Sequence, residues 1–257
     1  MGTLVTITLY AESADQAQRG FVAAFDRIRA IDLILSDYKP ESELSRACSF
    51  PGPVSRELET VLVHAQRVAE ATGGAFDITA GPVTSLWREA RKQKRLPDTA
   101  AIEDALRRTG YRKLSVSNRL VRCSEEGMRL DSGGIGKGYA ADEALRILKQ
   151  AGIVAALIAI SGDIAASAAP PGQPGWRIQV QDRIVELVNA AVSTSGDEFQ
   201  VLEIGGVRYS HVIDPRTGVP VRNGKAVSVI AGSGMEADSL ATAYAVAGTP
   251  GPVVDLR

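Results

Sequence analysis

The stretch LDSGGIGKGYAADEALRILKQAGIVAALIAI, residues 130–160, joins a glycine-rich turn to a helix and then to a buried strand. The pattern predicts a helix through YAADEALRILKQ that ends near Gly152, because glycine is common just after a helix. The apolar run that follows is too short to span a membrane and is typical of a buried strand over residues 154–160. This part of the chain therefore connects a helical segment to a sheet.

Helical and strand patterns do not alternate regularly on either side of this stretch. The first half holds one strand, TLVTITLY, and predicted helices over residues 15–35, 55–72 and 98–108. The second half holds the short strands WRIQV, VELVNAAVS, VRYSHVI and AVSVIA, followed by a helix that begins near Met235. We predict an α+β fold with mixed, mainly antiparallel sheets, packed helices and a helix-rich first half, in one domain over residues 1–257.

Composition narrows the class of protein. The 257 residues are 45% hydrophobic and 23% charged, which is ordinary for a soluble globular protein. The formal net charge of −1 gives no basic field for nucleic acid or an anionic membrane, and no transmembrane span or signal peptide is predicted. Cys48 and Cys123 belong to no metal-binding cluster; they could pair, but the pattern favours two buried free thiols and leaves the redox compartment open.

The glycine-rich turn does not match the standard nucleotide-binding loops. A P-loop requires glycine where Asp131 stands and Ser or Thr where Gly138 stands, and a Rossmann fingerprint requires glycine at Tyr139. The glycines still allow a ligand close to the backbone, with Lys137 as a positive charge and a helix N-terminus beside it. Taken alone, the pattern favours a simple strand-to-helix turn.

Three further motifs carry polar groups that suit chemistry. Asp238 and Thr242 share one helix face, and their oxygen donors suit Mg²⁺, although a carboxylate bonded to local backbone is equally consistent. His211, on a predicted strand before the turn DPRTG, is the candidate for acid–base chemistry, although a lone strand histidine is usually structural. Phe76 and Asp77 follow a helix, where they either line a cleft or begin a strand with an inward Phe.

The order of these motifs is more specific than any one of them. The segments MGT, SDYKPESELSR, GAFDITAGP, LDSGGIGKGYAAD, AISGDI, VSTSGD, YSHVIDPRTGVPV and MEADSLATA follow one another along the chain. In this order the sequence closely resembles the ApbE family, the Mg²⁺-dependent FAD:protein FMN transferases. The resemblance runs from Met1 to about Gly248, and it implies a fold related to the T-fold.

The resemblance also implies a set of site residues. The residues that it assigns to FAD are Met1, Tyr38, Ala75, Phe76, Asp77, Asp131, Lys137 and Val212. The residues that it assigns to Mg²⁺ are Gly134 and Ala241 through their carbonyls, together with Asp238 and Thr242. This implied metal site lies on the face of the last helix that carries Asp238 and Thr242, and so agrees with the Mg²⁺ alternative given above.

The implied reaction moves FMN from FAD to a threonine hydroxyl of an acceptor protein, and AMP leaves. We expect Asp238 to act through the metal, and we hypothesise that His211 deprotonates the threonine. Water in place of threonine would make the protein an FAD pyrophosphatase, and a third possibility is a non-catalytic FAD-binding protein. The family suggests a periplasmic or membrane-associated location, with a cytoplasmic one still open. Compared with the family, the two ends of this chain indicate either trimming or a divergent member, and a missing C-terminal strand would expose a sheet edge.

Overall fold

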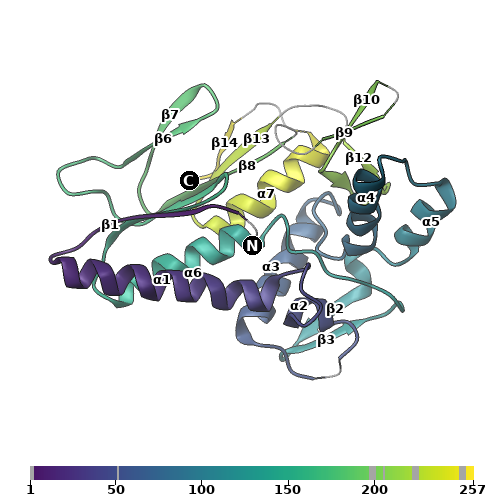
Figure 1. Cartoon of the computed structure of the whole chain (residues 1–257), viewed down its shortest axis with the longest axis horizontal. Helices are drawn as coiled ribbons and strands as arrows, with labels where there is room; N and C mark the ends of the chain where they lie inside the picture. Colours follow the sequence, from purple (N-terminus) through teal and green to yellow (C-terminus); the bar gives the residue numbers. More distant parts are fainter. Residues whose placement is uncertain (1–2, 51, 197–200, 205, 222–225, 249–252) are drawn as a thin grey trace.

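A computed structural model describes residues 3–50, 52–196, 201–204, 206–221, 226–248 and 253–257 (Figure 1). Its helices are α1 (Ala14–Leu35), α2 (Glu43–Arg46), α3 (Arg56–Ala71), α4 (Gly81–Gln93), α5 (Thr99–Arg107), the 3₁₀ turn η1 (Tyr111–Lys113), α6 (Gly136–Gln150) and α7 (Gly234–Ala247). Its strands are β1 (Val5–Tyr10), β2 (Leu114–Ser117), β3 (Leu120–Cys123), β4 (Ala155–Ile160), β5 (Asp163–Ala166), β6 (Trp176–Val180), β7 (Arg183–Leu187), β8 (Ala190–Ser195), β9 (Val201–Ile204), β10 (Val207–Ser210), β11 (Ile213–Asp214), β12 (Val219–Pro220), β13 (Val227–Ala231) and β14 (Val253–Asp255).

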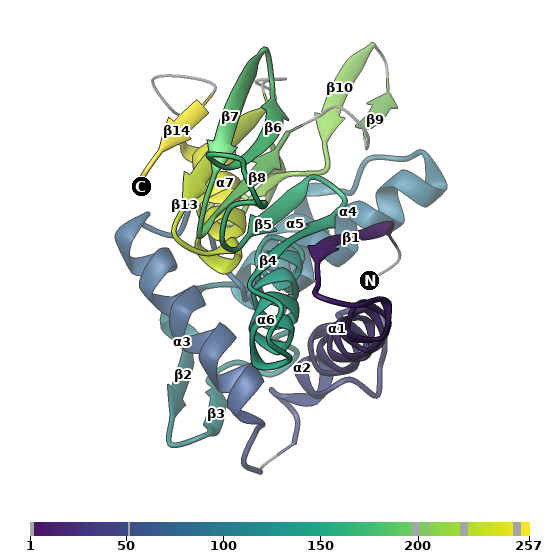
Figure 2. The same ribbon diagram turned by 90° about the vertical axis from the view of Figure 1, so that its left-hand side faces the viewer.

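A six-stranded sheet in the order β1-β4-β5-β8-β13-β14 forms the centre of the fold. Its neighbouring strands are antiparallel except for the parallel pair of β13 and β14. Helices α6 and α7 pack against this sheet, and α1 lies along α6 (Figures 1 and 2). The predicted α+β fold with mixed, mainly antiparallel sheets and a helix-rich first half is confirmed.

Strand β4 explains the apolar run that the sequence places after α6. Successive side chains of a strand point to opposite faces of the sheet. Ile158 and Ile160 lie fully buried in the core that the helices cover, whereas Leu157 belongs to a second core beneath the β6–β7 hairpin. Because both faces are covered, the strand is apolar along its whole length.

Local signals set the helix ends that the sequence predicts. The Ser55 hydroxyl accepts a hydrogen bond from Leu58 N at 3.1 Å and caps α3, as expected. Asp98 caps α5 in the same way. The strand considered after Phe76 does not form: residues 77–80 make a turn, and α4 begins at Gly81 with proline in its first turn.

Two expectations about long-range pairing are wrong. Cys48 and Cys123 form a disulfide with a Cα–Cα distance of 5.3 Å and are not free thiols. Their separation of 75 residues hid the contact, because it depends on how the loop after α2 packs against β3. The C-terminal strand that was expected to be missing after the last helix is present as β14, which pairs with β13. No helix in the described part of the chain combines the length and apolarity that crossing a bilayer requires.

Candidate active site

Two glycines set the distance between α6 and α7. A Cβ atom placed on Gly138 would lie 2.0 Å from the carbonyl oxygen of Gly234, so any side chain there would collide with the backbone of α7. The Asp142 carboxylate accepts hydrogen bonds from Gly234 N at 2.7 Å and Met235 N at 2.9 Å, where the positive end of the α7 dipole favours it. This close crossing brings α7 to the start of α6, and Gly138 N donates to Asp238 Oδ2 at 3.1 Å.

Lys137 lies between two buried carboxylates at this crossing. Its Nζ is 3.1 Å from Asp163 Oδ2 and 3.8 Å from Asp238 Oδ1, and it donates to the Gly133 carbonyl at 3.0 Å. Asp163 is 4% exposed and Asp238 is 2% exposed. The Ser193 hydroxyl donates to Asp163. Sites that far from water keep charged groups only when they are paired, so the three charges form one unit.

The charged groups of this cluster shift one another's pKa values. Burial raises the pKa of the Asp238 carboxyl, the Asp163 charge raises it further, and Lys137 opposes both effects. Burial works to lower the pKa of the Lys137 ammonium, but Asp238 and Asp163 outweigh it and hold that pKa above the usual range. With two carboxylates and one ammonium, the ionised cluster keeps a surplus negative charge that a cation would neutralise.

The glycine-rich turn meets α7 at Gly134, on the helix face that carries Thr242. A Cβ atom on Gly134 would lie 2.5 Å from Thr242 Oγ1, and Thr242 Oγ1 is 3.2 Å from Ser195 Oγ. The described residues contain no group of three or more His, Cys, Asp or Glu side chains fit to hold a metal ion. A cation here would therefore rest on Asp238, hydroxyl oxygens and backbone carbonyls, a donor set that fits a hard ion such as Mg²⁺. Ala241, one turn along α7 from Asp238, is buried, and its carbonyl contact stays a prediction.

Asp131 begins the turn and is held on two sides. Its Oδ1 accepts a hydrogen bond from Gly133 N at 2.8 Å, and its Oδ2 is 3.0 Å from a guanidinium nitrogen of Arg88 on α4. The same guanidinium lies 4.4 Å from the centre of the Tyr38 ring. The structure thus groups Tyr38 and Asp131, two of the residues assigned to FAD, around one arginine.

The triplet Ala75, Phe76 and Asp77 is buried. Asp77 Oδ1 accepts hydrogen bonds from Thr79 N and Thr79 Oγ1, and its Oδ2 accepts one from Tyr111 N at 2.7 Å. These bonds build the turn before α4, so the described contacts of the Asp77 carboxylate are structural. Contact of these three residues with FAD stays a prediction.

His211 and Val212 lie between β10 and β11. His211 is half-buried, and Val212 is buried with its N–H donating to Ser210 Oγ at 2.9 Å. Their roles in FAD binding and proton transfer stay predictions. Met1 lies outside the described residues.

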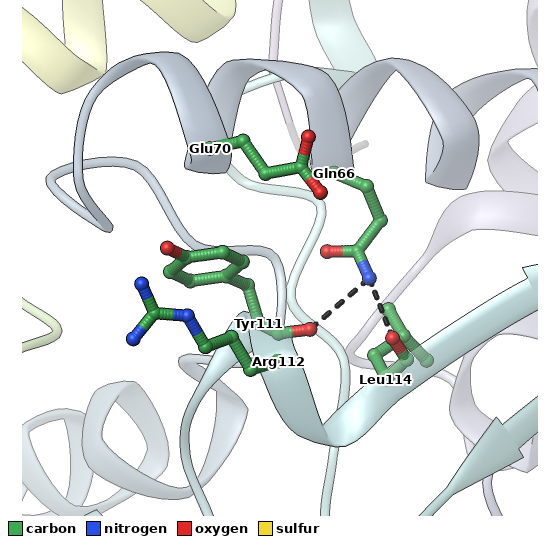
Figure 3. A pocket seen from close by; sticks show the side chains of 5 residues that line it. All are labelled: Gln66, Glu70, Tyr111, Arg112 and Leu114. Carbon is green, nitrogen blue, oxygen red and sulfur yellow. Dashed lines mark hydrogen bonds between the residues drawn. The ribbon is translucent and has the colours of Figure 1, made fainter.

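An open pocket of about 470 Å³ lies beside α3 and η1 (Figure 3). The Gln66 amide braces its wall by donating to the carbonyls of Tyr111 at 3.0 Å and Leu114 at 2.6 Å. Glu70 and Arg112 complete its lining, which includes none of the residues assigned to FAD or Mg²⁺. We therefore locate the site at the Lys137 cluster, where buried charges and the glycine-rich turn come together.

The model of the ApbE family matches residues 1–252. The chain belongs to the ApbE family. It is 34% identical over 270 residues to the FAD:protein FMN transferase of Salmonella typhimurium, and the match covers 97% of this chain and 77% of that protein. The FAD:protein FMN transferase of Treponema pallidum is 30% identical over 278 residues, with 96% of this chain and 77% of that protein covered.

Solved structures of the ApbE family give the same relationship. The apo form of the Pseudomonas stutzeri flavinyl transferase ApbE superposes with a TM-score of 0.86 at 30% identity, over 97% of this chain and 83% of that one. The flavin transferase ApbE of Vibrio cholerae gives a TM-score of 0.84 at 30% identity, over 97% and 85% of the two chains. Both the fold and the family are therefore those that the order of motifs implied.

Within this ApbE-family site, sequence reasoning missed Asp163, Asp37 and Arg88. Asp163 lies in the quoted segment AISGDI, and its signal was available: a lone carboxylate next to a buried strand needs a partner. The segment around Arg88, WREARKQKRL, is typical of the solvated, basic end of a helix. Arg88 lies near the middle of α4, and nothing in its local sequence indicates the carboxylates that it meets.

Proposed function

We propose that this chain is a Mg²⁺-dependent FAD:protein FMN transferase that attaches FMN to a threonine of an acceptor protein and releases AMP. The observation that carries the proposal is the junction of α6 and α7, where the half-buried Lys137 lies between the buried carboxylates of Asp163 and Asp238 beside the glycine-rich turn. The two relatives described above are named FAD:protein FMN transferase, which supports the transfer of FMN from FAD to a protein.

The residues at the junction divide the tasks of a phosphoryl transfer. Asp238 and Thr242, with the carbonyls of Gly134 and Ala241, would hold Mg²⁺, which when bound neutralises charge on the pyrophosphate. Lys137 supplies a fixed positive charge beside the same group. The turn lets the backbone come close to the ligand because it carries few side chains.

The bonds and protons of the reaction balance as follows. The threonine oxygen forms a bond to the phosphorus of the FMN half, and the bond from that phosphorus to the oxygen of AMP breaks. AMP leaves with the electron pair. We assign the proton of the threonine hydroxyl to His211. If water took the place of threonine, the same site would act as an FAD pyrophosphatase.

The test combines FAD, Mg²⁺ and a candidate redox-subunit acceptor, with AMP release and in-gel flavin fluorescence as readouts. A second acceptor carries alanine in place of its target threonine. Asp238→Asn should abolish both readouts, whereas Asp26→Asn, a surface carboxylate paired with Arg29, should change neither. AMP release at the same rate without an acceptor would identify a pyrophosphatase, and FAD binding with no AMP release under any condition would identify a binding protein.

We also propose that the chain works in an oxidising compartment, as a periplasmic or membrane-associated protein would. The disulfide between Cys48 and Cys123 supports this, because such bonds persist outside the reducing cytosol. Cells are lysed with a thiol-alkylating reagent, and the protein is weighed by mass spectrometry. Two alkyl groups on the native protein would contradict the proposal, and none would support it.

A further inference from the structure

Arg88, on α4, is bonded to two acidic side chains that come from distant parts of the chain. One terminal nitrogen of its guanidinium bonds to Asp37 Oδ2, and the other lies 3.0 Å from Asp131 Oδ2. The side chains of Asp37 and Asp131 are 10% and 9% exposed, and that of Arg88 is 25% exposed. Two largely buried carboxylates therefore share a single cation.

Without that cation, the two carboxylates would repel each other. Burial raises the pKa of the Asp37 carboxyl and the Asp131 charge raises it further, whereas Arg88 lowers it. The planar guanidinium can meet two carboxylates at once because it presents several N–H donors in a fixed fork. A lysine at this position would offer one ammonium to two partners.

Arg88 also supports Tyr38. Its guanidinium carbon lies 4.4 Å from the centre of the Tyr38 ring, a cation–π distance. Tyr38 is nevertheless 75% exposed, so most of the ring faces solvent. An aromatic side chain that is held by a cation and open to solvent is a platform on which a planar ring can stack.

A series of contacts extends from Arg88 to the Lys137 cluster. Asp131 uses one oxygen for Arg88 and the other to accept the N–H of Gly133 at 2.8 Å. The carbonyl of Gly133 in turn accepts a hydrogen bond from Lys137 Nζ at 3.0 Å. The conformation of the glycine-rich turn thus depends on where Arg88 holds Asp131.

We propose that Arg88 is a positioning residue that sets the affinity for FAD, by fixing the Tyr38 ring and the Asp131 end of the glycine-rich turn together. The inference rests on the proposed function, because FAD is taken as the substrate. Arg88 acts through Tyr38 and Asp131, so it governs binding of the dinucleotide more than the rate of the chemical step.

The test measures the Kd of FAD by flavin fluorescence, and KM and kcat by AMP release. Arg88→Gln should raise both Kd and KM about tenfold while kcat changes by less than about twofold, because a cation–π contact and a charge-assisted bond are lost. Arg88→Lys should recover part of the affinity. Lys92→Gln, on the same helix with its side chain 77% exposed, is the matched control and should match the wild type.

A double-mutant cycle with Tyr38→Leu separates positioning from general stability. If Arg88 acts through the ring, Arg88→Gln should cost less FAD affinity in the Tyr38→Leu background than in the wild type. Equal costs in both backgrounds, or a lower kcat at unchanged KM, would overturn the proposal.

A second variant covers the case in which Arg88→Gln fails to fold. Asp37→Asn removes one partner of Arg88 and should also raise the Kd of FAD; an unchanged Kd would count against the proposal. A wild-type chain that binds FAD without releasing AMP would refute the proposed function alone, because the Kd comparison still applies.

Discussion

Gly138→Ala tests whether the approach of α6 to α7 builds the site. Alanine favours a helix over glycine, so helix propensity alone would make this substitution stabilising by about 0.5–1 kcal/mol. The structure predicts the opposite, because the new Cβ would lie 2.0 Å from the Gly234 oxygen and 2.9 Å from Asp238 Cβ. The atom that it meets first belongs to the backbone of α7, which cannot turn aside as a flexible side chain can.

The size of the effect follows from this overlap. Real Cβ atoms essentially never approach another heavy atom closer than 3.0 Å, so the two helices must separate by the difference from 2.0 Å, which is about 1 Å. Overpacking of this kind costs about 1–3 kcal/mol. Because the backbone of α7 must move, we take the upper part of that range. From it we subtract the stabilisation that alanine gives through its higher helix propensity. The net loss is about 2 kcal/mol, or roughly 4–8 °C in melting temperature for a chain of this length.

Activity should suffer more than stability does. Asp238 is placed by its bond from Gly138 N, and a displacement of about 1 Å at a catalytic group can cost about 100-fold in rate. The assays are thermal melting and Mg²⁺-dependent AMP release. Gly232→Ala is the control, because a Cβ at that position meets nothing within 4 Å. If Gly138→Ala melts and turns over like Gly232→Ala, the helix crossing does not position Asp238 and the reasoning is wrong.

Three shorter predictions address the disulfide, the half-buried His64 and the lysine cluster. Replacing Cys48 and Cys123 by serine opens a loop of 75 residues, which the chain-entropy relation values at about 4.5 kcal/mol; urea unfolding should show a loss of that order, and an unchanged midpoint would contradict it. Burial holds the pKa of His64 below its ordinary value of 6.5, so the unfolded chain takes up the proton first as pH falls. Stability should therefore decline as pH drops below 6.5, and His64→Gln should flatten that decline in pH-dependent unfolding. Asp163→Asn removes the nearer partner of Lys137 and should weaken apparent Mg²⁺ affinity about tenfold at saturating FAD. The same Mg²⁺ titration for the variant and the wild type would show that Asp163 does not support Mg²⁺ binding.

Elements that depend on neighbours in the sequence could be predicted. Ser55 marks the start of α3 through a bond to a residue three positions away, and the spacing of apolar residues gives α1 and α6. The family resemblance adds Asp238 and Lys137, and the structure brings these two together with Asp163. Each of these signals is either local or carried by the order of motifs along the chain.

Contacts between distant residues were missed because no local pattern records them. Arg88 meets Asp37 and Asp131, which stand 51 and 43 positions away, and its own sequence context is that of an exposed basic helix. Gly138, next to the glycine-rich turn, is a second contact that the sequence does not indicate. The sequence indicates that glycines allow close approach, but only the packing shows that this one admits α7 and not a ligand.

The two buried carboxylates of the site differ in what holds them, and this difference bears on the chemistry. Asp163 lies at 3.1 Å from the Lys137 ammonium, whereas Asp238 is 3.8 Å from it and is held instead by the N–H of Gly138. A carboxylate fixed by a backbone N–H keeps its place without giving its charge to a nearby cation. Asp163 is thus the nearer partner of Lys137, and in the function proposed above Asp238 would share its negative charge between Lys137 and a metal ion. If both carboxylates paired equally with the lysine, a metal ion would have to displace Lys137 before it could bind, so the unequal distances favour a site in which the ammonium and the metal ion act side by side.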